Sequence, residues 1–331
     1  MELIKKQIHM NQWKGNAVTQ ITLDEDFIVP DTLEDMDQVI LDNARILGEN
    51  GRIQDEKMTV KGKMEFAVLY RKENGGLETL GGNIPFEEMV NVPGLKEGDD
   101  VTISWILEDM KAEMINSRKL GVQAIITLQV RVETLRDVEA AVDVDMENNS
   151  RPAGAGMSDT DGAGQVQVET LKRTANAAAI AVRRMDTYRI KEELSLTGGK
   201  PNIGQLLWRE MKLRDVQVKP LDGKIHISGD LNLFAIYQAE DENMPVQWLE
   251  ETIPFSGDME MGDVKEDQIP MVTVRLAHKD MEAKPDYDGE MREMDVDAVL
   301  ELDIKLYEEE EVELLSDMYS NNREIELNRS D

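Results

Sequence analysis

Residues Lys57 to Tyr70 read KMTVKGKMEFAVLY, and this stretch decides the fold. Its larger apolar side chains recur at alternate positions: Met58, Val60, Met64, Phe66, Val68 and Tyr70. A period of two is typical of a β-strand with one buried and one solvated face. The run is longer than most strands, and Gly62 lies on its apolar face. We therefore expect a bulge, a break or a close backbone approach at this glycine.

The same stretch recurs 167 residues later, at Lys224 to Tyr237, as KIHISGDLNLFAIY. Gly229 and Tyr237 take the places of Gly62 and Tyr70. Downstream, the tripeptide Ile-Pro-Phe also occurs twice, at Ile84, Pro85 and Phe86 and again at Ile253, Pro254 and Phe255. Small insertions between strand-like runs belong in surface turns, so the chain is predicted to be two copies of one domain.

The repeat divides the 331 residues into four parts. A polar, Gly-rich stretch at 147–164 predicts a flexible linker between the copies. The last residues are polar, and two interpretations stay open for them: a tail, or the lead-in to a further repeat. The predicted parts are a first β domain at 1–145, the linker at 146–166, a second β domain at 167–315 and the tail or lead-in at 316–331.

Further alternating runs accompany the repeated strand in each copy. They lie at 101–107 and 122–132 in the first copy and at 272–276 and 296–306 in the second. Several such runs with turn signals between them favour an antiparallel β-sandwich or an open barrel. The segment 176–182, NAAAIAV, would by itself favour a helix. Its partner in the first copy has no helical stripe, so we expect both to be extended.

Each copy also carries one helical signal. In the first, Asp31 or Thr32 can cap a short helix whose apolar side chains lie near one face, at Leu33, Met36, Val39 and Ile40. In the second, Pro201 precedes the corresponding set, Ile203, Leu206 and Leu207. The sequence therefore predicts a mainly β protein with one short helix in each domain.

The composition limits the classes of partner. The 68 acidic residues outnumber the 37 lysines and arginines, and the net charge is −31. Such a charge repels nucleic-acid phosphates and anionic lipids, and it leaves a solvated acidic surface or a basic partner as the two interpretations. The chain has no cysteine, no signal-peptide pattern and no apolar run long enough to span a membrane. A cytosolic location is the default expectation.

No pattern in the sequence predicts a catalytic, cofactor or metal site. The three histidines, His9, His226 and His278, lack metal-ligand spacing. Residues 159–162 and 286–289 resemble the start of a calcium loop, but neither has a glutamate at the twelfth position, so we interpret both as turns. The tryptophan most readily assigned to the core is Trp105, which lies in phase with neighbouring apolar residues.

One acidic run has two interpretations. Glu308, Glu309, Glu310 and Glu311 follow the last strand-like run of the second copy. They form either a solvated edge whose like charges oppose edge-to-edge pairing, or a docking patch for a basic surface.

Taken in order, the motifs of both copies resemble the SPOCS (spore-coat-associated) domain of spore-forming Firmicutes. In the first copy these are FIVPD (27–31), VKGKMEFAVLY (60–70), the Ile84-Pro85-Phe86 turn, VPG (92–94) and NSRKL (116–120). In the second they are DTYRIKEELSL (186–196), KPNIGQLL (200–207), TIPFSG (252–257) and LELDIKLYEEEEVELLSDMYS (300–320). The nearest architecture is that of SipL-type spore morphogenesis proteins, in which such domains precede a C-terminal LysM module. This sequence ends before any LysM, and a longer chain that carries one is the open alternative.

The resemblance implies a non-enzymatic scaffold or adaptor in spore coat assembly, located in the mother cell at the forespore surface. Its implied partners are coat morphogenesis proteins, among them the SpoIVA-type coat ATPase that the LysM module engages. The family offers no catalytic residues to transfer. The alternative hypothesis is a carbohydrate- or peptidoglycan-binding β-sandwich, for which exposed aromatic side chains should line a groove.

Overall fold

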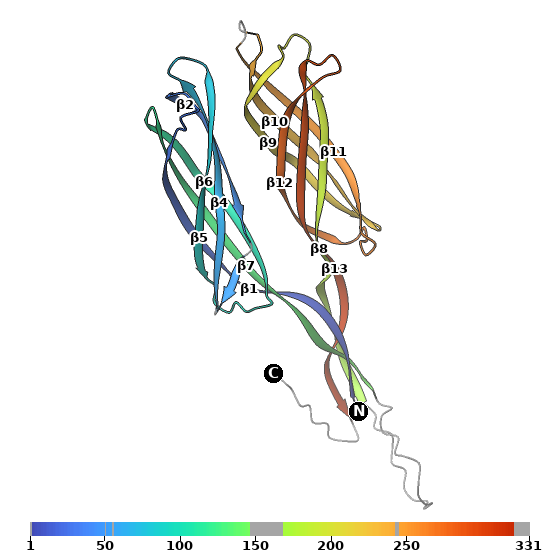
Figure 1. The fold of residues 1–331 in the computed structure, drawn as a ribbon. Helices are drawn as coiled ribbons and strands as arrows, with labels where there is room; N and C mark the ends of the chain where they lie inside the picture. Colours follow the sequence, from blue (N-terminus) through green and yellow to red (C-terminus); the bar gives the residue numbers. More distant parts are fainter. Residues whose placement is uncertain (1, 50, 55, 146–167, 242–244, 321–331) are drawn as a thin grey trace, which may run out of the picture.

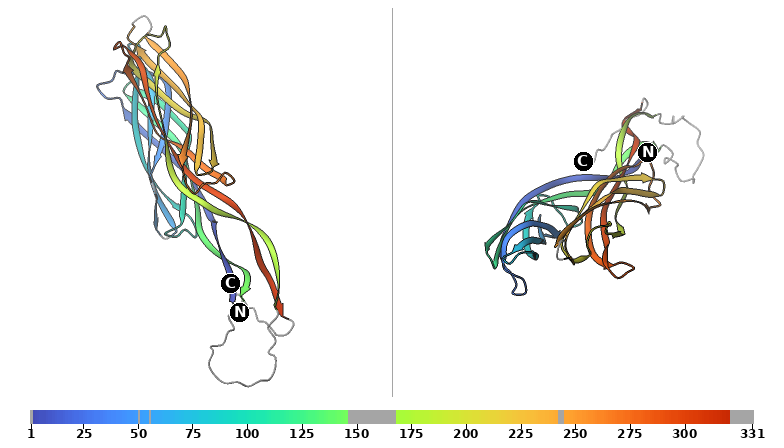
Figure 2. Two further views of the ribbon diagram at one scale, coloured as in Figure 1. Left: turned by 90° about the vertical axis from the view of Figure 1, so that its right-hand side faces the viewer. Right: turned by 90° about the horizontal axis from the view of Figure 1, so that it is seen from above.

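A computed structural model describes residues 2–49, 51–54, 56–145, 168–241 and 245–320. Two elongated β bodies lie side by side, and two twisted ribbons extend from them as a common stalk (Figures 1 and 2). The predicted linker, the turn at 159–162 and residues 321–331 lie outside the described part. Residues 316–320, expected to be tail or lead-in, instead continue the last strand of the second domain. The described part contains no helix with the length and hydropathy that a membrane crossing needs.

The first domain has seven strands: β1 (Glu2–Ile28), β2 (Met36–Gly48), β3 (Arg52–Gln54), β4 (Lys57–Lys72), β5 (Leu77–Asn91), β6 (Asp100–Asn116) and β7 (Lys119–Asp145). The second has six: β8 (Val168–Ser195), β9 (Ile203–Leu221), β10 (Lys224–Ala239), β11 (Val246–Glu260), β12 (Ile269–Pro285) and β13 (Met291–Ser320). Each domain has two antiparallel sheets. In the first, β7 lies between β1 and β6, and β4 lies between β5 on one side and β2 and β3 on the other. In the second, β13 lies between β8 and β12, and β10 between β9 and β11.

The matching strand order confirms the duplication. The repeated stretch forms β4 in one domain and β10 in the other, each at the centre of its sheet. Inward side chains of these strands share a core with those of β7 or β13 in the facing sheet, which makes each domain a sandwich. Val68 and Tyr70 in the first core and Leu231 and Tyr237 in the second are fully buried. Full burial of side chains this large contributes about 1.5–3 kcal/mol each to folding.

The repeated glycine allows an aromatic ring to cross the central strand. Gly62 lies opposite Phe86, and Gly229 lies opposite Phe255. A Cβ atom on Gly62 would lie 2.6 Å from Cζ of Phe86, and one on Gly229 would lie 2.9 Å from Cζ of Phe255. The predicted close approach is confirmed. The bulge or break expected at Gly62 is not found, since β4 pairs with β2 and β5 through this residue without a register shift. Beside Gly229 the register does shift, but the additional residue belongs to β9.

The Ile-Pro-Phe tripeptide is not a turn, contrary to the sequence-based expectation. Both copies lie within an outer strand, β5 or β11, where isoleucine and phenylalanine face the core and the proline is exposed. Proline is tolerated there because an outer strand has one edge without a ladder partner.

The predicted short helices are also wrong, and β-bulges explain the error. After a turn at 31–33, residues 36–48 form β2, whose pairing with β4 shifts register between Met36 and Gln38 and again between Val39 and Leu41. A bulge inserts one residue, so inward positions recur after three residues instead of two. Met36 and Val39 therefore both reach the core with helix-like spacing. In β9 the same shifts occur around residues 203–208.

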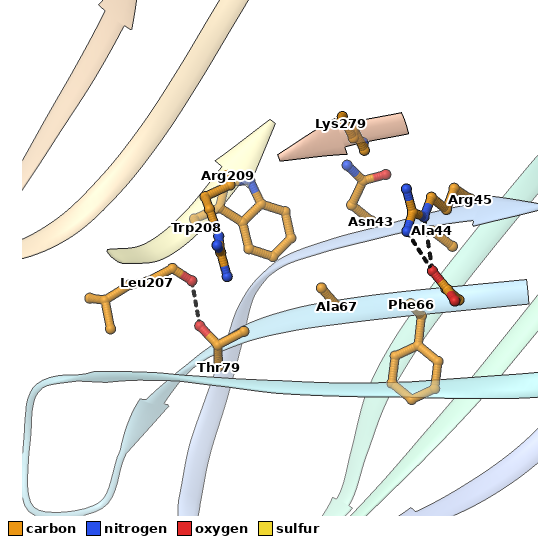
Figure 3. Close-up of a pocket in the computed structure, with 11 residues that line it drawn as sticks. Asn43, Ala44, Arg45, Phe66, Ala67, Thr79, Leu207, Trp208, Arg209 and Lys279 are labelled. Atoms are coloured by element: carbon orange, nitrogen blue, oxygen red, sulfur yellow. Dashed lines mark hydrogen bonds and ion pairs between the residues drawn. The ribbon is translucent and has the colours of Figure 1, made fainter. Parts of the chain in front are cut away.

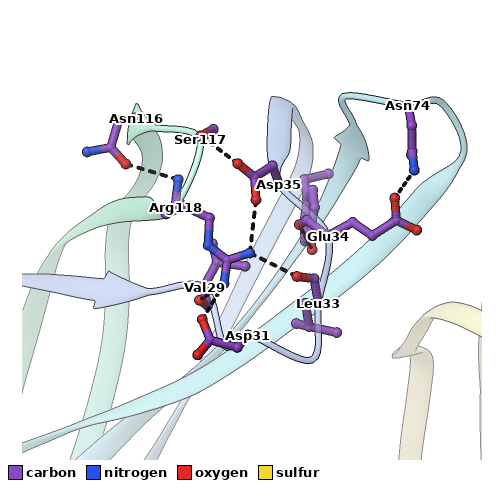
Figure 4. Close-up of polar contacts among 10 residues, drawn as sticks. Val29, Asp31, Leu33, Glu34, Asp35, Asn74, Asn116, Ser117 and Arg118 are labelled. Atoms are coloured by element: carbon purple, nitrogen blue, oxygen red, sulfur yellow. Dashed lines mark hydrogen bonds and ion pairs between the residues drawn. The ribbon is translucent and has the colours of Figure 1, made fainter.

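A duplicated arginine holds the loop that joins the two sheets (Figure 4). Arg118, in the turn between β6 and β7, donates from Nη1 to the Leu33 carbonyl at 2.9 Å and from Nη2 to the Val29 carbonyl at 2.9 Å. It also contacts Asp31 at 3.1 Å and Asp35 at 3.0 Å, so Asp31 binds an arginine and caps no helix.

The second copy repeats this arrangement. Arg292 donates from Nη1 to the Lys200 carbonyl and to Oδ1 of Asn202, both at 3.0 Å. The repeated tyrosines complete each loop: the Tyr70 hydroxyl donates to the Glu34 carbonyl at 3.0 Å, and the Tyr237 hydroxyl donates to the Pro201 carbonyl at 3.2 Å.

Replacing either loop arginine should destabilise its domain. Lysine cannot make the forked contacts of Arg118 or Arg292, so each Arg→Lys variant should lower the free energy of unfolding by about 1–3 kcal/mol. Arg71→Lys is the control, because Arg71 pairs with Asp37 on the exposed surface and should change stability by less than about 1 kcal/mol. Denaturant unfolding measures all three, and equal effects would contradict the assigned role.

The phenol of Tyr70 should ionise late. Burial, with the charge of Glu78, raises its pKa to about 12. Because this pKa is above that of the unfolded chain, the neutral phenol stabilises the fold fully below pH about 10, and the contribution is lost as the pH rises through about 12. Tyr70→Phe should remove a late step from the ultraviolet titration of phenolate. Tyr287→Phe, at an exposed side chain, should leave that step unchanged. Loss of an early step in Tyr70→Phe would contradict the assignment.

Candidate functional site

The residues that mark the repeat lie in the framework of the two domains. Gly62, Tyr70, Ile84 and Phe86 line the first core, and Gly229, Tyr237, Ile253 and Phe255 occupy the matching places in the second. Pro85 and Pro254 are exposed, one on each domain. The structure therefore does not bring these residues together into one site, and interaction surfaces must be sought elsewhere.

The stalk consists of the projecting ends of four strands: residues 2–14 and 133–145 form one ribbon, and residues 168–182 and 307–320 form the other. The ribbons wind around each other below the sandwiches (Figure 1). The alanine-rich segment 176–182 is extended here, as predicted, and its alanines pair with Glu308, Glu309 and Glu310. Buried apolar side chains come from both ribbons: Ile8 from the first, and Ala179, Val312 and Met318 from the second.

Salt bridges join the two ribbons. Lys6 of the first pairs with Glu310 of the second, and Lys172 of the second pairs with Asp143 of the first at 2.9 Å. Of the predicted acidic patch, Glu310 thus contributes to the stalk itself. Glu308 lies 3.5 Å from Lys265, while Glu309 and Glu311 are exposed.

Apolar side chains are also exposed along the stalk. Trp13 is 61 % exposed and Leu135 is 53 % exposed, although they lie on adjacent strands of one ribbon. Leu3, Leu171 and Tyr319 add to this exposed set. Exposed apolar side chains gathered on one part of a protein are typical of binding surfaces, and tryptophan is enriched among the residues that carry binding energy.

A buried charge cluster lies where the stalk meets the domains. The Lys305 ammonium of β13 is 2.7 Å from the Glu133 carboxylate of β7 and 3.4 Å from that of Asp100 in β6. Arg183 of β8 pairs with the same Asp100, and Asn11 donates to Glu133. The side chains of Lys305 and Glu133 are only 8 % and 12 % exposed. The cluster thus ties the second domain to the first.

The cluster favours the ionised forms of both Glu133 and Lys305. Burial pushes the pKa of Glu133 up, but hydrogen bonds from Lys305 and Asn11 outweigh it, so the pKa is lowered. For Lys305, burial opposes the charged form, while the hydrogen bond and charge of Glu133 outweigh it and raise the pKa. A buried pair of this kind is worth little if both partners are replaced, but losing one partner is strongly destabilising.

The sandwiches also touch side by side, above the cluster. Leu69 of β4 packs with Leu207 and Trp208 of β9, and the Thr79 hydroxyl of β5 donates to the Leu207 carbonyl. Neither this contact nor the charge cluster could be read from the sequence, because the residues that meet lie on different copies. Lys305 follows the ordinary alternation of polar residues along its strand.

One constellation has the residue types of a hydrolytic triad. His226 Nδ1 lies 2.7 Å from Asp258, and its Nε2 lies 3.4 Å from the Ser256 hydroxyl. The second distance exceeds the reach expected between a nucleophile and its base. These side chains lie on a surface of the β10–β11 pair and line neither of the described cavities. Within the described ranges, no group of three His, Cys, Asp or Glu could hold a metal ion.

The turn at 286–289 closes on itself. Oδ1 of Asp286 accepts from the amides of Asp288 and Glu290, both at 3.0 Å, and Gly289 has a φ of 84°. The geometry of an ordinary turn thus accounts for these aspartates, in agreement with the sequence-based interpretation.

Comparison with known proteins identifies the repeated unit. Residues 35–115 and residues 202–284 each match the family model described as SipL, SPOCS domain. The two matches run from β2 to β6 and from β9 to β12, so they begin and end at equivalent places in the two copies. No match was found among curated proteins or solved structures.

Replacing the buried Lys305 should weaken the contact between the two domains. Lys305→Met leaves the Glu133 carboxylate without its cation and should lower the free energy of unfolding by about 3 kcal/mol or more. Lys305→Met combined with Glu133→Gln should recover part of that loss. Lys5→Met, which breaks an exposed pair with Glu139, should cost less than about 1 kcal/mol. Denaturant unfolding compares them, and a Lys305→Met variant as stable as the parent would refute the role.

Proposed function

We propose that this chain, which carries two tandem SPOCS domains, is a non-enzymatic scaffold in spore coat assembly. The observation that carries the proposal is the family match in both copies. The contacts between the two domains also support a scaffold. The charge cluster and the side-by-side contact hold the domains in one arrangement. Two domains fixed in this way can present a constant surface to a partner.

The partners we propose are coat morphogenesis proteins, including the SpoIVA-type coat ATPase, met in the mother-cell cytoplasm at the forespore surface. The stalk is the surface best suited to them, because Trp13 and Leu135 are large, apolar and exposed. Tryptophan is among the residues that most often carry the binding energy of protein interfaces. Glu309 and Glu311, exposed on the other ribbon, favour a partner with basic residues beside its apolar contact.

A carbohydrate-binding function has less support. It calls for aromatic rings exposed along a groove, whereas Phe66 and Trp208, which line a described cavity, are both buried. The exposed rings of Trp13, Trp248, Tyr287 and Tyr319 lie on separate elements. We therefore propose the scaffold alone.

The stalk hypothesis predicts selective loss of partner binding. Tagged chain should recover coat morphogenesis proteins from sporulating cells and bind the purified coat ATPase. Trp13→Ser combined with Leu135→Ser should weaken that binding tenfold or more, with stability changed by less than about 1 kcal/mol because both side chains are exposed.

Met89→Ser is the matched control, since Met89 is equally exposed but lies on β5. It should bind like the parent. Recovery of no coat protein would overturn the scaffold proposal. Equal binding by all variants would leave the scaffold intact and remove the stalk as its surface.

A further inference from the structure

A cavity lies where the two domains meet, and it is lined by both of them (Figure 3). Its volume is about 230 Å³. β2, β4 and β5 of the first domain and β9 and β12 of the second supply its walls. A neighbouring cavity of about 250 Å³ shares Arg45, Arg209 and Lys279 with it. The paired cavities therefore depend on the docked arrangement of the domains.

Three cations line this space in a chain whose net charge is −31. Arg45 pairs with Glu65 at 2.8 Å, and that carboxylate also binds Lys63 at 2.7 Å. Asp280, the other acidic residue of the lining, accepts the Met281 amide hydrogen at 3.0 Å. Both carboxylates thus already have donors within the protein.

The remaining two cations have no carboxylate partner among the described residues. Arg209 donates from Nη1 to the Met281 carbonyl at 3.0 Å, a neutral acceptor. The Lys279 ammonium has no hydrogen bond or ion pair within the described ranges, although it is half-buried. Burial lowers the pKa of Lys279, and the charge of Arg45, directed at the same space, lowers it further. The charges of Glu210 and Lys212 act on it in opposite senses.

The walls around these cations are suited to a small organic ligand. Trp208, Phe66 and Ala67 provide an apolar side, and Asn43 provides an amide that can donate a hydrogen bond. The cavity is smaller than most drug-sized pockets, so it admits a compact molecule or a single substituent. Guanidinium groups bind carboxylate and phosphate through parallel hydrogen bonds, and lysine adds a point charge.

We propose that the junction cavity binds a small organic anion that carries carboxylate or phosphate groups, with Lys279 and Arg209 as its charged contacts. A ligand bound between both domains stabilises their docked arrangement through the free energy of binding. The strongly acidic remainder of the chain repels anions, so saturable binding of an anion reports a local site of this kind. The proposal does not depend on the scaffold function.

Calorimetric titration at low ionic strength tests the site with three probes: succinate, inorganic phosphate and neutral succinamide. We expect saturable one-to-one binding of succinate or phosphate with a Kd of about 1 mM or below, and none of succinamide. Succinate binding alone would assign the carboxylate, and phosphate binding alone the phosphate. The ligand that binds should also raise the thermal unfolding midpoint.

Variants of Lys279 connect the binding to this cavity. Lys279→Met should weaken binding tenfold or more while leaving the stability of the ligand-free chain unchanged or higher, since an unpaired cation is removed. Lys279→Arg should retain affinity within a few-fold. Lys111→Met, which removes the same charge from an exposed pair with Glu113 on β6, should bind like the parent. No saturable binding of either anion, or equal binding by Lys279→Met, would overturn the proposal.

Discussion

Aliphatic and aromatic side chains at alternate positions of β4 and β10 are buried against a facing sheet, and the rest of the structure is arranged around that burial. Both copies bury their central strand in this way, and both have the same two supporting contacts. A glycine of the central strand lies opposite a phenylalanine, and a tyrosine donates a hydrogen bond to the loop that joins the two sheets. An arginine closes that loop in both copies: Arg118 in the turn before β7 and Arg292 at the start of β13. The central strands β4 and β10 pair with β5 and β11 without a register shift, whereas β2 and β9 bulge against them.

The stalk results from the length of four strands. β1, β7, β8 and β13 have 27 to 30 residues each, far more than a sandwich needs to cover its core. Their ends leave the domains as two ribbons, and a buried lysine and glutamate join them at the base. Because the ribbons come from different copies, their union fixes how the domains lie, and it thereby creates the junction cavity.

Charge is distributed unevenly over this framework. The chain as a whole carries a net charge of −31, which repels other anions. The stalk combines exposed apolar residues with glutamates, whereas the junction gathers cations. The molecule therefore has two chemically distinct regions, an apolar and acidic stalk and a junction lined by cations.

The sequence by itself determined the duplication, the central strands and the class of fold, since alternation along Lys57–Tyr70 and Lys224–Tyr237 is a local property. The sequence indicated the Glu308–Glu311 run as a candidate interaction patch. It did not predict that Glu308 and Glu310 pair with lysines of the same chain. Only the tertiary structure decided that Met36 and Val39 belong to a bulged strand, because helix and bulge give the same spacing until a neighbouring strand supplies hydrogen bonds. It alone also brought Lys305 to Glu133 and Arg45 to Lys279, since those meetings depend on how two separately encoded domains dock.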